Sequence, residues 1–254
     1  MNAQNPKHNW LIWLMAFCLV ATVALADTGT PVPPNDGFTV VSSSKRIDGD
    51  SVGVQAIAGN VSELMINSSF VTNGWQGYYG NISGTIVLDD ALNNTMYSWE
   101  LADPEGEIYA SRDNSLDWGI GNIICADITN IETEESTLKF NLDLGQDADG
   151  INETFKFTTH PPFIVASNVF DANDCGFTAS TYVDDTADPN RAFNETILYS
   201  TSDVSMIYTA LIIRGGNEGF KLGGDNYDFQ MLVPEDGHQG DLIPTDYFFW
   251  VEIQ

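Results

Sequence analysis

Three groups of acidic residues have the chemistry that a divalent cation needs. They are Asp143, Asp147, Asp149, Asn152 and Glu153 around Gly150; Asp184, Asp185, Asp188 and Asn190; and Asp225 with Asp228. Calcium takes about six to eight oxygen ligands, which carboxylates supply. An EF-hand loop needs an acid five positions before its glycine, but Gly145 stands there, and Asp and Gly are also ordinary turn residues. We interpret the first group as a hairpin turn, keep calcium as the alternative at each group, and expect no other cofactor.

Aromatic residues gather in the first half of the chain, interleaved with Asn and Gly. They are Trp75, Tyr78, Tyr79, Tyr97, Trp99 and Trp118. Planar rings beside amide groups can stack on sugar faces, and large rings also fill the core of a β-sandwich while their polar tips find partners. We favour core packing, and we keep glycan contact through Trp75, Tyr78, Tyr79, Trp99 and Trp118 as the alternative.

The sequence offers no motif for catalysis. Paired carboxylates can cleave a glycosidic bond, but among 36 acidic residues some pair will always lie close together. His160 and His238 both lie beside turn residues, and no G-x-S-x-G, P-loop or dinucleotide pattern occurs. We predict that the chain is not an enzyme and assign no catalytic residue, with an extracellular hydrolase as the second alternative function.

The charge of the chain excludes one class of partner. Nine Lys and Arg stand against 36 Asp and Glu, so the net charge is -27. A chain this acidic repels phosphates, and we predict no nucleic-acid binding. Apolar residues make up 43% of the chain, which excludes a disordered acidic tail. A bound cation or a salty medium would relieve the self-repulsion.

The start of the chain predicts export. An apolar run without charged residues extends from Trp10 to Ala26 and ends in Ala24-Leu25-Ala26, a pattern typical of a cleaved signal peptide. We predict a signal peptide over residues 1–26 and a secreted or cell-surface protein. If the run stays uncleaved, it is the single membrane contact that we expect.

Cysteines and sequons fit an exported chain. Cys125 and Cys175 are the two cysteines left after cleavage, which predicts one disulfide outside the cell. Six N-x-[ST] sequons predict glycosylation on exposed turns, with ordinary loop composition as the alternative. They begin at Asn60, Asn67, Asn81, Asn93, Asn152 and Asn194.

The elements that must position these residues are strands. Residues 27–37 form a Pro- and Gly-rich tether, and residues 38–254 carry apolar residues at every second position. We expect a hairpin over residues 137–158, a strand covered on both faces over 206–213, and a final strand over 247–253. Other expected strands are 38–43, 80–88, 96–101, 107–111, 163–166, 177–183, 196–200 and 227–233, and a helical turn is suggested near 61–66. The pattern predicts an all-β, antiparallel β-sandwich, as one unit or two packed subdomains, with an opened barrel as the alternative.

Several spaced stretches resemble an uncharacterised family of exported, β-rich surface or secreted proteins from mostly small-genome archaea. The stretches are residues 74–84, 96–99, 106–111, 208–211, 227–235 and 247–253, with both cysteines between them. The resemblance implies an archaeal cell-surface or secreted setting and supplies no catalytic residue.

Together these features predict a secreted or cell-surface acidic β-sandwich with a structural, adhesive or assembly role at the cell exterior. The expected partners are cell-surface proteins or glycans, or further copies of the chain. An extracellular glycan-binding module is the first alternative.

Overall fold

The computed structural model describes residues 30–34, 37, 39–46, 55–65, 71–100, 104–140, 147–182, 191–220, 224–237 and 243–254. The predicted signal peptide, residues 1–26, lies outside this part of the chain. Within the described ranges, no helix combines the length and the apolar character that crossing a membrane requires.

The prediction of an antiparallel all-β fold is confirmed, with 39% strand and 8% helix. The strands are β1 (Trp75–Gly80), β2 (Thr85–Asp89), β3 (Thr95–Glu100), β4 (Gly106–Ser111), β5 (Ile123–Cys125), β6 (Phe163–Val165), β7 (Asn168–Phe170), β8 (Thr178–Tyr182), β9 (Arg191–Ser200), β10 (Ser205–Leu211), β11 (Asn217–Glu218), β12 (Asn226–Tyr227), β13 (Phe229–Pro234) and β14 (Phe248–Ile253). The helices are α1 (Ile128–Thr137) and α2 (Ile151–Thr154).

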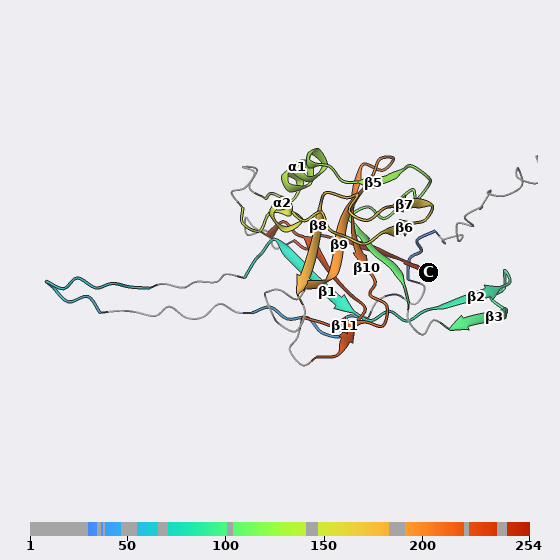
Figure 1. The fold of residues 1–254 in the computed structure, drawn as a ribbon, viewed down its shortest axis with the longest axis horizontal. Helices are drawn as coiled ribbons and strands as arrows, with labels where there is room; N and C mark the ends of the chain where they lie inside the picture. Colours follow the sequence, from blue (N-terminus) through green and yellow to red (C-terminus); the bar gives the residue numbers. More distant parts are fainter. Residues whose placement is uncertain are drawn as a thin grey trace, which may run out of the picture.

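A six-stranded sheet forms the centre of the fold (Figure 1). Its order is β14-β4-β10-β9-β5, and β8 pairs with the first half of β9 on the edge that β5 shares. At the opposite edge, Val32 from the predicted tether exchanges two backbone hydrogen bonds with Val251 of β14, at 3.0 and 2.9 Å. Part of the tether therefore pairs with the outer edge of β14. Without this cover, the free backbone N–H and C=O groups of the edge strand could pair with another chain.

Both faces of this sheet are buried. On one face, Ile197 and Tyr208 pack with Met231 of β13, Ile131 of α1 and Phe155, which follows α2. β13 pairs with β1, so these two strands and the helices form the covering layer.

On the other face of the sheet, Tyr109, Leu198, Ile207 and Trp250 pack with residues of the β6–β7 hairpin. The central strands consequently bury the side chains that point to one face of the sheet as well as those that point to the other. This explains why residues 206–211 lack a polar face, as the sequence predicted.

Three sequence expectations about local structure are wrong. The region of the expected hairpin over 137–158 holds the end of α1 and all of α2, and residues 141–146 lie outside the described ranges. The helix expected near 61–66 is not formed over 61–65, and the strand expected at 38–43 is not formed over 39–43.

The physical reason for α1 lies at its first turn. The Asp127 carboxylate accepts a hydrogen bond from the Asn130 backbone N–H, and the Asn130 side chain accepts one from the Asp127 N–H, both at 2.9 Å. This capping box satisfies two amides that a helix start leaves without partners. Leu138 and Phe140 are buried in the coil after the helix, so their alternate spacing reflects packing rather than a strand.

Candidate functional site

The β2–β3 hairpin projects away from the six-stranded sheet (Figure 1). Among the described strands, β2 and β3 pair only with each other. The register places Ile86 opposite Trp99 and Leu88 opposite Tyr97. Residues directly opposite each other in an antiparallel pair share one face of the sheet. These four side chains therefore form one face without a polar residue, which we call the apolar hairpin face.

The apolar hairpin face is open to solvent. Its side chains are 44% (Ile86), 51% (Leu88), 59% (Tyr97) and 48% (Trp99) exposed. The rings of Tyr97 and Trp99 contact each other edge to face, with centroids 4.8 Å apart. A two-stranded hairpin is marginally stable in water on its own, and contiguous apolar surface on a folded protein marks a site of interaction. This face is the candidate functional site.

The opposite face of the hairpin is mixed in character. Val87 lies opposite Ser98, and Met96 belongs to the same alternation. Val87 and Met96 are exposed too, at 45% and 82%. Both faces are thus open to solvent, but they differ in chemistry. Substitutions on the second face can therefore serve as a control for substitutions on the first.

The turn that joins β2 and β3 is ordered and acidic. The Asp90 carboxylate accepts hydrogen bonds from the backbone N–H groups of Leu92 and Asn94 and from the Asn94 side chain, at 2.8–2.9 Å. These bonds favour the charged form and lower the pKa of Asp90 below its ordinary value. No Lys or Arg occurs in the sequence between Arg46 and Arg112, so the hairpin carries negative charge alone.

A second exposed apolar segment, residues 55–65, extends on the opposite side of the main sheet (Figure 1). Ile57, Val61, Leu64 and Met65 are each at least 60% exposed. The segment forms neither a strand nor a helix, so these side chains do not share a defined face. It lacks the paired register that makes the hairpin a surface.

The five rings kept as the alternative glycan contacts do not form one platform. Trp75 packs against Phe140 and Phe155, and its indole N–H donates to the Asp149 carbonyl oxygen at 2.6 Å. The Tyr78 ring lies edge-on to Phe249 at 5.3 Å.

The remaining three rings lie in three different places. Tyr79 packs edge-on against both Phe220 and Tyr227, with ring centroids 4.6 and 4.8 Å away. Trp118 is 8% exposed in the core. Of the five, Trp99 is the ring that lies on the apolar hairpin face.

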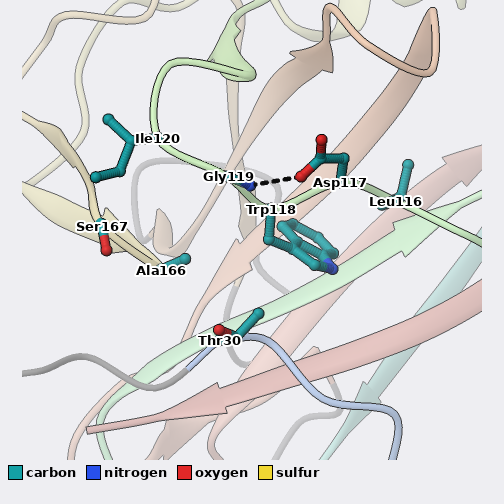
Figure 2. Close-up of a pocket in the computed structure, with 8 residues that line it drawn as sticks. All are labelled: Thr30, Leu116, Asp117, Trp118, Gly119, Ile120, Ala166 and Ser167. Atoms are coloured by element: carbon teal, nitrogen blue, oxygen red, sulfur yellow. Dashed lines mark hydrogen bonds between the residues drawn. The ribbon is translucent and has the colours of Figure 1, made fainter.

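A shallow pocket of about 370 Å³ lies beside Trp118 (Figure 2). The Asp117 carboxylate in its wall accepts a hydrogen bond from the Gly119 N–H at 3.0 Å. The Trp118 ring packs against the rings of Tyr109 and Trp250, with centroids 5.0 and 5.7 Å away. The Trp118 ring thus packs in the core, and the Asp117 carboxylate stabilises its own loop. The pocket is lined by Thr30, Leu116, Asp117, Trp118, Gly119, Ile120, Ala166 and Ser167.

Two glutamates form a carboxylate pair inside the fold, behind this wall. Glu107 of β4 lies opposite Glu252 of β14, and the exposed fractions are 4% and 2%. The Tyr109 hydroxyl lies 3.4 Å from a Glu107 oxygen and 3.0 Å from a Glu252 oxygen, and the Ala166 N–H donates to Glu252 at 2.8 Å. Burial and the neighbouring Glu252 raise the pKa of Glu107 to about 8, and burial raises that of Glu252. Carboxyls this deeply buried cannot meet a glycosidic bond in solution.

Glu195 is a third acid inside the fold. It is 0% exposed, and its carboxylate accepts the Leu232 N–H at 2.8 Å, which ties β13 to β9. Complete burial raises the pKa of Glu195 well above its ordinary value. Glu134 is also buried, and the Arg112 guanidinium donates to both of its carboxylate oxygens, at 3.1 and 2.5 Å.

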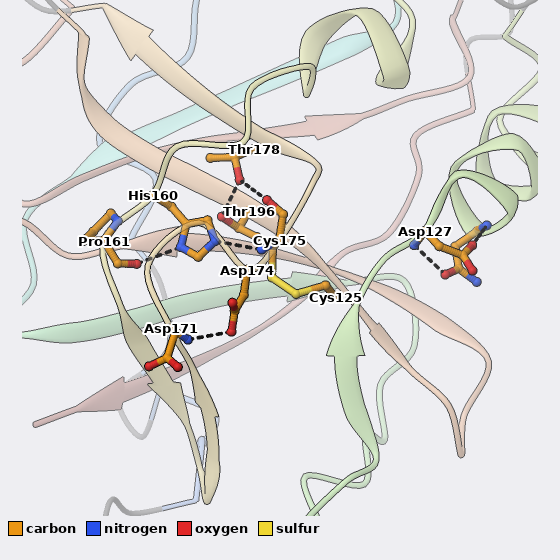
Figure 3. The surroundings of a disulfide bond; sticks show 10 residues. Cys125, Asp127, His160, Pro161, Asp171, Asp174, Cys175, Thr178 and Thr196 are labelled. Carbon is orange, nitrogen blue, oxygen red and sulfur yellow. Dashed lines mark hydrogen bonds between the residues drawn. A yellow bond between two sulfur atoms is a disulfide. The ribbon is translucent and has the colours of Figure 1, made fainter.

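The predicted disulfide between Cys125 and Cys175 is present (Figure 3). His160 lies beside it, 3% exposed, and its Nε2 accepts the Cys175 backbone N–H at 2.9 Å. The ring proton therefore belongs on Nδ1, which lies 2.7 Å from the Pro161 carbonyl oxygen. His160 is thus a neutral structural residue, whereas His238 lies outside the described part of the chain.

Five of the eleven residues kept as alternative calcium ligands lie outside the part of the chain that the structure describes. Asp143, Asp184, Asp185 and Asp188 belong to these, together with Asn190. In the described ranges, no three His, Cys, Asp or Glu side chains are placed to hold a metal ion.

Two of the described acids in these groups accept hydrogen bonds from protein donors. Asp149 accepts a hydrogen bond from the Thr72 hydroxyl, and Asp228 accepts the Ile82 N–H at 2.7 Å. The Asn152 N–H at the start of α2 donates to the carboxylate of Glu135, a residue of α1, at 3.0 Å.

The predicted sequons differ in their surroundings. Asn194 lies within β9, where its side-chain oxygen accepts the Ser180 hydroxyl, and Asn152 lies half-buried in α2. Asn67 is outside the described ranges. The exposed sequons are Asn60, Asn81 and Asn93.

Comparisons of the chain with protein-family models, with curated proteins and with solved structures find no match.

Proposed function

We propose that this protein is a structural or adhesive component of the cell exterior, and that it makes its contacts through the apolar hairpin face. The observation that carries the proposal is the uncovered face of Ile86, Leu88, Tyr97 and Trp99 on a hairpin that stands away from the core. Covering such a face removes apolar area from water and stabilises an otherwise marginal hairpin.

Two features support the exterior setting. The predicted signal peptide and the disulfide between Cys125 and Cys175 both fit an oxidising compartment. The carboxylate pair of Glu107 and Glu252 is buried and out of reach of a substrate in solution, so it does not support hydrolysis as the function.

Paired variants of the two hairpin faces test the proposal. Leu88→Ser with Tyr97→Ser makes the apolar face polar, and Val87→Ser with Met96→Ser makes a similar change on the control face. Each purified variant is measured for self-association by sedimentation and for co-sedimentation with an envelope fraction from the source cells. Contact is expected to be lost in the first variant and kept in the second. If the unmodified protein makes neither contact, or both variants keep it, the proposal fails.

The second candidate function is glycan binding, now confined to the edge-to-face pair of Tyr97 and Trp99. These rings are exposed and lie next to the sequon at Asn93. Exposed aromatic rings can stack on sugar faces. A glycan array with the Trp99→Ala variant as control tests this reading. Binding that disappears in the variant supports it, and an array without hits removes it.

A further inference from the structure

We infer that the partner of the apolar hairpin face is the same face on a second copy of this chain. This inference rests on the proposed function and adds the identity of the partner. The contact is a two-fold, hairpin-to-hairpin contact in which each copy uses the same residues.

Charge supports a second copy over a basic protein. Each chain has a net charge of -27, so two copies repel wherever their acidic residues approach each other. The apolar hairpin face has no charged side chain, and it is therefore a place where two copies can meet with little repulsion. A basic partner would instead be bound best by a docking face with acidic groups, which this face lacks.

The shape of the hairpin allows the contact. Two pleated sheets pack face to face about 10 Å apart, with their side chains interdigitated. A two-fold axis parallel to the strands places β2 of one copy over β3 of the other. Ile86 and Leu88 then meet the rings of Tyr97 and Trp99 in both directions. Because the hairpin projects from the six-stranded sheet, the two bodies can stay apart (Figure 1).

The area of the face sets the strength of the contact. An aromatic side chain can bury about 150–250 Å², so four side chains that are half exposed bring roughly 350–400 Å² per copy. Two copies together bury roughly 800 Å², below the ~1,200 Å² at which stable interfaces begin. The contact is consequently weak in dilute solution and strengthens where copies are concentrated, as on a surface.

The salt dependence of binding distinguishes this self-contact from a contact with a basic partner. Raising sodium chloride from about 0.1 M to about 1 M shortens the Debye length from about 10 Å to about 3 Å. Screening removes repulsion between like-charged copies, so self-association strengthens with salt. A contact with a basic partner weakens under the same change.

The test is sedimentation equilibrium of the full chain over a range of concentrations at both salt levels. As the protein concentration increases, the average mass is expected to rise from that of one chain toward twice that value. In high salt, this rise is expected to begin at a lower protein concentration. The Leu88→Ser/Tyr97→Ser variant is expected to reduce the association constant at least tenfold, and the Val87→Ser/Met96→Ser variant less than twofold. Circular dichroism of both variants serves as the control for folding, and spectra that match that of the unmodified chain are expected.

Three results overturn the inference. One is a chain that stays monomeric at every concentration and salt level, and another is association that both variants leave intact. The third is association that weakens as salt rises. If the chain is monomeric but the first variant still loses envelope binding, the inference fails while the proposed function stands. If envelope binding is also missing, both fail.

Discussion

Replacing Glu107 with Gln is expected to remove a large part of the pH dependence of stability. Glu107 is 4% exposed and lies opposite Glu252, so its charged form is disfavoured by burial and by a like charge. Its pKa rises from 4.5 to about 8 on folding. Gln keeps the size and the hydrogen-bonding oxygen of Glu but cannot ionise.

The direction of the effect follows from proton binding. Between pH 4.5 and about 8, the folded state holds a proton on Glu107 that the unfolded state has released. The stabilisation from this proton is fully present below pH 4.5 and is lost as the pH rises through 8. A difference of about 3.5 pKa units corresponds to about 4–5 kcal/mol, as an upper value. The raised pKa values of Glu252, Glu195 and Glu135 act in the same direction, so a smaller slope remains in the variant.

Urea unfolding across this pH range measures the effect. The unmodified chain is expected to lose several kcal/mol of unfolding free energy toward pH 8, while the Glu107→Gln variant matches it near pH 4.5 and exceeds it near pH 8. The control is Glu105→Gln, which removes the same charge from an exposed residue paired with Arg214. Equal pH profiles for the unmodified chain and Glu107→Gln would refute the reasoning.

Three further predictions concern the disulfide, the buried histidine and the sequons. Replacing both Cys125 and Cys175 with Ser is expected to lower the unfolding free energy by about 4 kcal/mol, because the bond closes a loop across a separation of 50 residues; unfolding curves that coincide would contradict this. His160→Ala is expected to cost about 1–3 kcal/mol in urea unfolding, because the buried Cys175 N–H loses its acceptor, and a loss under about 0.5 kcal/mol would contradict the assigned role. In a host that glycosylates exported sequons, peptide mass spectrometry is expected to find glycan at exposed acceptors and not at Asn152 or Asn194; glycan on Asn194 in folded protein would disprove this sorting. The expected acceptors are Asn60, Asn81 and Asn93.

The strands of the main sheet were largely predictable, because their alternation or continuous apolar character reflects which faces are buried. β4, β10 and β14 lie where the sequence placed strands. The helical turn that the sequence suggests lies near residues 61–66, and α1 over 128–137 is not among the expected elements. Leu138 and Phe140, which follow α1, imitate an alternating strand although they lie in coil. The Asp127-x-x-Asn130 cap was the local signal that could have revealed the helix.

The candidate site was only half visible in the sequence. Ile86 and Leu88 are two residues apart, as are Tyr97 and Trp99, so each strand alone shows an apolar alternation. The register that places all four on one face, and the fact that nothing described covers it, come from tertiary structure. Burial of Glu107 was equally invisible, because Glu at an alternating position normally indicates a solvent face.

Hydrogen–deuterium exchange of the β2–β3 amides tests the central claim most directly. The protein is compared in dilute solution and in its associated or envelope-bound state. Covering the apolar hairpin face is expected to slow exchange over residues 85–100 in the bound state, while exchange in β9 and β10 stays unchanged. Equal exchange of the hairpin in both states, with protection appearing elsewhere, would show that the contact surface lies on another part of the molecule.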